Sequence, residues 1–294
     1  MEADALLLFF ADEAAAAQRI AHAAVMQCAP IHRHRFPDGE LKLLLPEVLP
    51  PRVVILRSLN HPNEKLIELL LSARTARTLG ARHLTLLAPY LAYMRQDKAF
   101  RPGEAISQTV VGGFLASMVD AVITVDPHLH RINSLQQAIP AEQTIVISGA
   151  PLLADLIASH HADPLLLGPD EESEQWVALA AARHHFEHAV CTKQRLGDQD
   201  VNMSLPDRPV RGRAVVLLDD VASSGHTLAT ATALLLAAGA ASVDVAVTHA
   251  LFAGDAISQL HQAGVDRVWS TDCVQHESNA VSMAAPIAQV LMNL

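Results

Sequence analysis

Hydroxyl-bearing residues and a glycine gather where one apolar run of the sequence ends. Ala214–Leu218 reads as a buried parallel strand, and Leu228–Ala238 reads as the helix that follows it. In open α/β sheets, ligands bind at the carboxyl ends of strands, because loops and helix N-termini meet there. Loop hydroxyls and the backbone N–H groups at the positive end of a helix suit a phosphate group. The residues of this predicted phosphate site are Ser223, Ser224, Gly225 and Thr227.

Two acids, Asp219 and Asp220, stand directly before this loop. Carboxylates repel phosphate, so these two suit sugar hydroxyls or a divalent cation instead. The segment therefore predicts a site for a phosphorylated sugar with a metal ion, whereas the alternative is an acidic turn and a helix cap that bind no ligand. The pattern resembles the 5-phosphoribosyl-1-pyrophosphate loop of type I phosphoribosyltransferases and ribose-phosphate pyrophosphokinases. The loop alone does not choose between these two families.

Two polar segments stand out in the first half of the chain. A Pro-Asp-Gly sequence flanked by Phe36 and Glu40 predicts a tight turn, and without further context it is an ordinary one. The segment Pro89–Glu104 concentrates positive charge in an acidic protein. Within it, Arg95 and Gln96 offer planar donors that suit a polyphosphate, and a solvated loop is the alternative.

Four further polar residues follow expected strands. His128 and Asp170 each come shortly after an apolar strand. A histidine at such a place can ligate a metal or orient a phosphate, although a lone histidine is more often structural. Lys193 and Arg195 belong to the polar stretch 192–202, which has the composition of a mobile lid.

Composition narrows the class of protein and ligand. A hydrophobic content of 51% over 294 residues excludes a disordered chain, and a net charge of -10 argues against nonspecific binding to nucleic acid or to acidic membranes. The isolated thiols Cys28, Cys191 and Cys273 fit a reducing cytosol. The apolar run Leu6–Phe10 lacks a basic segment before it, and no apolar run reaches the roughly 18 residues of a membrane helix. We expect a soluble, cytoplasmic protein with a small anionic ligand.

Strand and helix patterns alternate along the chain and predict an α/β fold. Residues 76–89 and 235–248 share a helix, a Gly-Ala stop and a strand, which is a weak internal repeat. Two domains of related topology explain it most simply. Only the second carries the acidic and hydroxyl loop; the comparable strand end in the first, after Arg57, reads Ser-Leu-Asn-His-Pro. We expect domains at 1–143 and 144–280, with a helix in 281–294 that packs back on the first domain.

Taken together, six segments in this order resemble ribose-phosphate pyrophosphokinases. Single segments are weak signals, but six in order cover most of the chain from residue 36 to about residue 275. The segments are Phe36-Pro-Asp-Gly-Glu40, Tyr93-Met-Arg-Gln-Asp-Lys98, Asp126-Pro-His128, Gly168-Pro-Asp170, Lys193-Gln-Arg195 and Asp219 through Thr227. The resemblance implies two domains of the type I phosphoribosyltransferase type, each a mainly parallel sheet flanked by helices.

The family's reaction is transfer of the β,γ-diphosphoryl group of ATP to the 1-hydroxyl of ribose 5-phosphate. Its products are phosphoribosyl pyrophosphate and AMP, and its cofactor is Mg²⁺. By match to the family's motifs, Phe36, Asp38 and Glu40 would hold the adenine of a neighbouring subunit. Arg95 and Gln96 would bind the ATP.

The remaining matches assign the metal, the transferred group and the sugar. His128 and Asp170 would help to position magnesium, and Lys193 and Arg195 would stabilise charge on the transferred group. For ribose 5-phosphate, two acids would take the hydroxyls and the loop would take the phosphate: Asp219, Asp220, Ser223, Ser224, Gly225, His226 and Thr227.

The chain departs from the family pattern at a few positions. Ser223 and His226 differ from the Asp and Gly common in the long bacterial and animal enzymes, so the loop is more similar to the archaeal type or to that of an ordinary phosphoribosyltransferase. Pro127 replaces the usual Leu, and Glu171 and Glu172 are more acidic than the usual small residues. These departures bear on regulation, on oligomer size and on full activity.

Two alternatives stay open. A phosphoribosyltransferase that consumes the sugar diphosphate would need no ATP contacts, so the Arg95-Gln96 and Lys193-Arg195 segments speak against it. A catalytically silent relative that binds nucleotides and regulates a partner is the other. The family's shared ATP site implies a homo-oligomer, with a dimer as the minimum.

Overall fold

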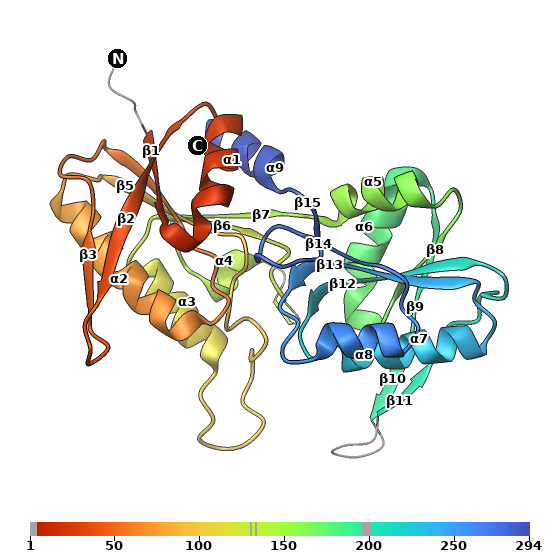
Figure 1. The fold of residues 1–294 in the computed structure, drawn as a ribbon. Helices are drawn as coiled ribbons and strands as arrows, with labels where there is room; N and C mark the ends of the chain where they lie inside the picture. Colours follow the sequence, from red (N-terminus) through yellow and green to blue (C-terminus); the bar gives the residue numbers. More distant parts are fainter. Residues whose placement is uncertain (1–4, 130, 133, 196–200) are drawn as a thin grey trace. The chain divides into compact units, whose positions relative to one another are not determined.

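The computed structural model describes residues 5–129, 131–132, 134–195 and 201–294 (Figure 1). The chain divides into two compact units. Unit 1 comprises Met1–Ile147 together with Met283–Leu294, and unit 2 comprises Ser148–Ser282. The end of the chain therefore belongs to the first unit, where the last helix contacts the first.

Unit 1 is built on a seven-stranded sheet in the order β3-β2-β1-β4-β5-β6-β7. All neighbouring strands pair in parallel except β2 and β3, which form an antiparallel hairpin at one edge. The strands β1, β4, β5 and β6 are almost wholly buried, as expected for continuous apolar runs covered on both faces. The strands are β1 (Ala5–Phe10), β2 (Gln27–Arg35), β3 (Leu41–Leu44), β4 (Arg52–Leu56), β5 (His83–Ala88), β6 (Ala121–Val125) and β7 (Gln143–Ile147).

Helices cover both faces of this sheet, with α1 and α9 on one face and α2 and α3 on the other (Figure 1). Successive residues of a strand point to opposite faces of the sheet, so each face can pack against its own layer of helices. On one face, Leu8, Ile55 and Leu86 share a core with Leu69 and Ala73 of α2. The helical elements are η1 (Ala11–Glu13), α1 (Ala14–Ala23), α2 (Pro62–Thr78), α3 (Ser107–Ala116), α4 (Leu135–Ala138) and α9 (Ala284–Met292).

Unit 2 contains a six-stranded parallel sheet in the order β15-β14-β13-β12-β8-β9. A separate antiparallel hairpin consists of β10 and β11. The strands are β8 (Leu165–Gly168), β9 (Glu187–Val190), β10 (Thr192–Arg195), β11 (Val201–Ser204), β12 (Ala214–Ala222), β13 (Ser242–Ala250), β14 (Val268–Thr271) and β15 (Asn279–Val281).

The unit 2 sheet also lies between two helical layers. Leu165, Leu167 and Val215 share a core with α7 and α8, whereas the intervening Leu166 and Val216 share another with α5 and α6. The helical elements are α5 (Ala150–His160), η2 (Glu171–Ser173), α6 (Glu174–His184), α7 (His226–Ala237) and α8 (Ala256–Gln262). No helix in the described part of the chain has both the length and the apolar character needed to cross a membrane.

The first helix differs from the sequence prediction. The apolar spacing predicts a helix over 13–28, but α1 ends at Ala23, after which Val25 adopts a left-handed φ of 52°. Gln27–Arg35 instead forms β2, of which only Ile31 is buried. The sequence of β2 lacks the apolar alternation that signals a strand. Backbone pairing with β1 and β3, rather than burial of side chains in the core, holds this strand in place.

Candidate active site

The strand order of unit 2 reverses between β8 and β12, because the chain runs from β8 to β9 on one side and from β12 to β13 on the other. Ligands of open α/β sheets bind beside the carboxyl ends of the strands at such a point. Asp170 follows β8 there, and Asp219 and Asp220 lie in the last part of β12. The topology thus brings the carboxylate of Asp170 to the same sheet edge as the adjacent carboxylates of Asp219 and Asp220.

The charges of these acids act on one another. Burial, together with the charges of Asp220 and Asp170, raises the pKa of Asp219 well above its usual range. Asp219 also accepts the backbone N–H of Asp220 at Oδ1, 3.0 Å away, and Asp220 is 2% exposed. Donor hydroxyls or a cation would relieve this repulsion, so the arrangement suits the predicted binding of sugar hydroxyls.

The hydroxyl-rich loop connects β12 to α7. Gly225 caps the helix with a φ of 73°, a left-handed conformation that favours glycine, whereas a Cβ atom there would meet Ala256 Cβ at an ordinary contact distance of 3.4 Å. The N–H of Ala253 donates to the carbonyl of Ser223 at 2.9 Å and fixes the start of the loop. Ser224 and His226 are exposed at the helix N-terminus, where an anion is stabilised.

Asp170 is held in a defined orientation. Its Oδ1 accepts the N–H of Glu172 at 3.2 Å, and its carbonyl accepts the Ser173 hydroxyl at 2.6 Å. Gly168 is required before it, because an added Cβ would stand 2.1 Å from Ser173 Oγ. The second predicted metal residue, the half-buried His128, follows β6 in unit 1.

Magnesium fits the chemistry of the unit 2 donors. Among the described residues, no group of three or more His, Cys, Asp or Glu side chains is arranged to hold a metal ion. Mg²⁺ is commonly bound through one or two carboxylates, with substrate phosphate oxygens and water completing its octahedron. The carboxylates of Asp170, Asp219 and Asp220 offer hard oxygen donors of this kind.

The turn between β2 and β3 carries Phe36, Asp38 and Glu40. The N–H of Phe36 donates to the Glu40 carbonyl at 2.9 Å, and Asp38 Oδ1 accepts the N–H of Glu40 at 3.2 Å. Gly39 closes the turn with a φ of 95°. All three predicted residues are exposed, with Phe36 at 40%, so their side chains are accessible to a ligand.

Arg95 and Gln96 lie in the loop between β5 and α3. The Gln96 carbonyl accepts the N–H of Gln108 at 3.2 Å, and its side-chain Oε1 accepts the Ser107 hydroxyl at 2.5 Å. The buried Gln108 also donates from Nε2 to the Met94 carbonyl at 3.0 Å. The first turn of α3 thus fixes the loop, and Arg95 next to it is exposed.

Lys193 and Arg195 belong to β10 rather than to an irregular loop. They pair with Met203 and Val201 of β11. Their side chains, and residues 196–200 between the two strands, lie outside the described part of the structure.

Comparisons with known proteins cover nearly the whole chain. Residues 6–118 match the family described as the N-terminal domain of ribose phosphate pyrophosphokinase, and residues 137–286 match the phosphoribosyl transferase domain family. The ribose-phosphate pyrophosphokinase of Methanopyrus kandleri is 34% identical over 94% of this chain and 95% of its own length. The chain belongs to the ribose-phosphate pyrophosphokinase family.

A second relative and a solved structure support the same family and fold. The ribose-phosphate pyrophosphokinase of Methanothermobacter thermautotrophicus is 31% identical over 89% of this chain and 91% of its own length. The crystal structure of phosphoribosylpyrophosphate synthetase from Mycobacterium smegmatis superposes with a TM-score of 0.85 at 24% identity and covers 97% of both chains. The predicted fold, two phosphoribosyltransferase-type α/β domains, is confirmed.

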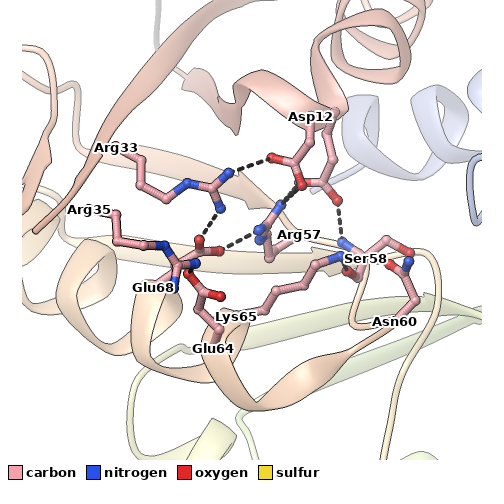
Figure 2. Close-up of polar contacts among 10 residues, drawn as sticks. Asp12, Arg33, Arg35, Arg57, Ser58, Asn60, Glu64, Lys65 and Glu68 are labelled. Atoms are coloured by element: carbon pink, nitrogen blue, oxygen red, sulfur yellow. Dashed lines mark hydrogen bonds and ion pairs between the residues drawn. The ribbon is translucent and has the colours of Figure 1, made fainter. Parts of the chain in front are cut away.

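Unit 1 has a reversal of strand order of its own, between β1 and β4, and charged side chains of the protein occupy it (Figure 2). Arg57, 1% exposed, follows β4 and donates to Asp12 and Glu13, which follow β1. Sequence reasoning missed this cluster in the pyrophosphokinase, although the same signal, a charge directly after an apolar strand, was available. Its members are Asp12, Glu13, Arg33, Arg35, Arg57, Glu64, Lys65 and Glu68.

Proposed function

We propose that the protein transfers the β,γ-diphosphoryl group of ATP to the 1-hydroxyl of ribose 5-phosphate, giving phosphoribosyl pyrophosphate and AMP. One observation carries the proposal: pyrophosphokinase relatives are similar over 94% of the chain and not over the second unit alone. The name of those relatives disfavours the alternative that the chain consumes the sugar diphosphate as a phosphoribosyltransferase.

Unit 2 binds the sugar phosphate in this proposal. Asp219 and Asp220 accept hydrogen bonds from the ribose hydroxyls, and this satisfies a carboxylate whose pKa the site has raised. The 5-phosphate binds at the N-terminus of α7, where hydroxyls and backbone N–H groups surround it. The residues that hold it are Ser223, Ser224, Gly225, His226 and Thr227.

Unit 1 binds the nucleotide. The exposed turn that carries Phe36, Asp38 and Glu40 holds the adenine ring of ATP bound by a neighbouring subunit. Arg95 and Gln96 contact the ATP from a loop that α3 fixes at its base. This arrangement needs a homo-oligomer, with a dimer as the smallest form.

The chemistry is a direct displacement. The 1-hydroxyl oxygen of the sugar forms a bond to the β-phosphorus of ATP, the bond from that phosphorus to the oxygen of the α-phosphate breaks, and the hydroxyl proton is lost as AMP leaves. Positioning and charge neutralisation supply most of the acceleration in phosphoryl transfer, so no nucleophilic side chain is needed. Lys193 and Arg195 neutralise charge on the transferred group.

The proposal includes magnesium and a cellular location. His128 and Asp170 position Mg²⁺, which supplies charge neutralisation of the phosphate oxygens when bound. The protein works in the cytoplasm, in keeping with its three cysteines Cys28, Cys191 and Cys273, which form no disulfide.

The direct test is to incubate the purified protein with ATP, Mg²⁺ and ribose 5-phosphate and to measure AMP. Formation of AMP that depends on the sugar phosphate supports the proposal. Binding of both ligands without formation of AMP would refute it and indicate a catalytically silent relative. Release of pyrophosphate from phosphoribosyl pyrophosphate and a nucleobase, without AMP from ATP, would indicate a phosphoribosyltransferase.

A further inference from the structure

Two ion pairs connect β2, the second strand from the edge of the sheet, to helix α2 (Figure 2). Arg33 Nη1 pairs with Glu68 Oε1, and Arg35 Nη2 pairs with Glu64 Oε1. The spacings match: residues two apart on a strand are about 6.6 Å apart along it, and residues four apart on a helix rise about 6 Å. The two pairs therefore form a ladder of two rungs, which we call the β2–α2 ladder.

Buried charges anchor this ladder inside unit 1. The Glu68 side chain is 0% exposed and also pairs with Arg57 Nη2. Arg57 in turn donates from Nη1 to Asp12 Oδ2 at 2.7 Å and to Glu13 Oε2 at 3.1 Å. Its guanidinium carbon lies 4.5 Å from the centre of the Phe10 ring, so the Arg33–Glu68 pair is attached to the ends of β1 and β4.

The arginines of the cluster are already paired with acids of the protein, which argues against a ligand site here. Four cationic side chains, Arg33, Arg35, Arg57 and Lys65, face four acidic ones: Asp12, Glu13, Glu64 and Glu68. Lys65 Nζ also donates to the Ser58 carbonyl at 2.7 Å and to Asn60 Oδ1 at 2.6 Å. Each of the three arginines already pairs with at least one of these acids, so the cluster acts on the protein's own elements.

The Arg35–Glu64 pair lies next to the turn with the proposed adenine residues. Arg35 directly precedes Phe36, whose N–H donates to the Glu40 carbonyl at 2.9 Å. An open depression of about 490 Å³ beside the turn is lined by Arg35, Gly39, Glu40, Leu41, Glu64 and Ile67. A shift of Arg35 relative to Glu64 would therefore change both the turn and the wall of this depression.

Apolar packing alone does not hold this end of the hairpin. In β2 only Ile31 is buried, and the four residues from His32 to Arg35 are exposed. The partner strand β3 has four residues and lies at the edge of the sheet. The ladder is thus the main side-chain connection between the end of β2 and the body of unit 1.

We propose that Glu64 and Glu68 are positioning residues for nucleotide binding, because their ion pairs with Arg35 and Arg33 hold the Phe36–Glu40 turn in the orientation that receives the adenine ring. The inference rests on the proposed function, since it assigns the adenine to that turn. Neither glutamate touches a reacting atom, so the effect of losing one falls on binding of ATP and not on turnover.

The decisive variant is Glu64→Gln, which keeps the size of the side chain and removes its charge. Exposed ion pairs contribute modestly, so the KM for ATP should rise by about 3- to 5-fold. The KM for ribose 5-phosphate and kcat should stay within about 2-fold of wild type, because only the adenine turn is affected. Amide hydrogen exchange at Phe36 and Glu40 should also be faster.

Two further variants separate positioning from general stability. Exchanging the charges in Arg35→Glu/Glu64→Arg should bring the KM for ATP back toward wild type. Arg77→Gln is the matched control: it breaks the pair between Arg77 Nη2 and Asp120, with both oxygens at 2.7 Å, at the other end of the same helix. This variant should leave the KM for ATP unchanged. Glu68→Gln should have a larger effect than Glu64→Gln if it folds, since its carboxylate is buried.

The outcomes distinguish failure of the proposed function from failure of the positioning role of Glu64 and Glu68. If wild type forms no AMP, the proposed function fails and the inference fails with it. If wild type is active and Glu64→Gln has an unchanged KM for ATP, the inference alone is overturned. A fall in kcat with no recovery in the charge-exchanged variant would likewise overturn it, because that result indicates a structural role.

Discussion

In unit 1, Nη1 of Arg57 lies 2.7 Å from Oδ2 of Asp12 and joins the carboxyl ends of the neighbouring strands β4 and β1. Strand order reverses at this point, where an open α/β sheet ordinarily binds its ligand. In unit 2 the corresponding reversal between β8 and β12 carries three acids, and burial together with the charges of Asp220 and Asp170 raises the pKa of Asp219. The two units thus use one topological feature differently: unit 1 fills it with its own charges, and unit 2 offers it to a sugar phosphate in the proposed reaction.

The cluster around Arg57 predicts a pH effect on stability. Burial raises the pKa of Glu13 from its ordinary 4.5 to about 7, although Arg57 opposes the shift. The folded state then binds a proton that the unfolded state has released, so the contribution of Glu13 to stability is present below pH 4.5 and is lost as the pH rises through 7. Relative to Glu13→Gln, wild type should lose on the order of 3 kcal/mol of unfolding free energy across this window.

Urea unfolding of both proteins between pH 4.5 and 8 measures this difference. Because other titrating groups affect both proteins alike, the gap between the two curves reports Glu13. Two parallel curves would show that Glu13 ionises at its ordinary pKa in the folded protein.

Two adjacent glycines of α3 should respond in opposite ways to alanine. A Cβ atom on Gly112 would stand 1.8 Å from the carbonyl oxygen of Ala138 in α4, so Gly112→Ala should destabilise the protein by about 3 kcal/mol. A Cβ atom on Gly113 meets nothing within 4 Å, so Gly113→Ala should stabilise it by up to about 1 kcal/mol through helix propensity. Thermal or urea unfolding measures both, and equal effects would show that α3 and α4 do not pack as described.

Lys193 should be important for turnover and not for folding. By analogy with the loss of one donor that stabilises the transition state, Lys193→Ala should lower kcat by at least roughly 100-fold while the unfolding midpoint stays near that of wild type. Lys42→Ala is the control, since Lys42 is an exposed lysine on another strand. Steady-state kinetics decide the matter, and a normal kcat for Lys193→Ala would remove this residue from the mechanism.

If the adenine turn serves a neighbouring subunit, two inactive variants should complement each other. Phe36→Ala damages the turn that one chain donates, whereas Lys193→Ala damages the site that receives it. A mixed dimer then contains one site with both defects and one with neither, so refolding the two variants together should restore about a quarter of wild-type activity. No recovery on mixing, with mixed oligomers present by native mass spectrometry, would place both residues in the site of one chain.

The sequence was most informative where apolar strands end in polar residues. The strand before Asp219 is a continuous apolar run, and the loop after it holds a glycine at a left-handed position, so the strand, the turn and the helix are all signalled locally. Asp170 has the same kind of signal, because Gly168 precedes it where no Cβ fits. The fold class followed from the alternation of such strands with helices.

What the sequence concealed depends on contacts between distant residues. The strand β2 is rich in histidine and arginine, and its structure comes from pairing with β1 and β3 and from the ladder to α2. Arg33 and Glu68 are 35 residues apart, and Arg57 and Asp12 are 45 apart, so no local pattern connects them. The segment 192–202 has the composition of a loop, whereas pairing of β10 with β11 makes a hairpin there.

The most direct test of the proposed reaction follows the phosphorus atoms of ATP. Two parallel reactions contain Mg²⁺, ribose 5-phosphate and ATP labelled either at the β-phosphorus or at the γ-phosphorus. The account predicts that both labels enter the sugar phosphate in equal yield, with one AMP formed for each product molecule. Transfer of the γ label alone, with release of ADP, would contradict it, as would the absence of both labels from the sugar.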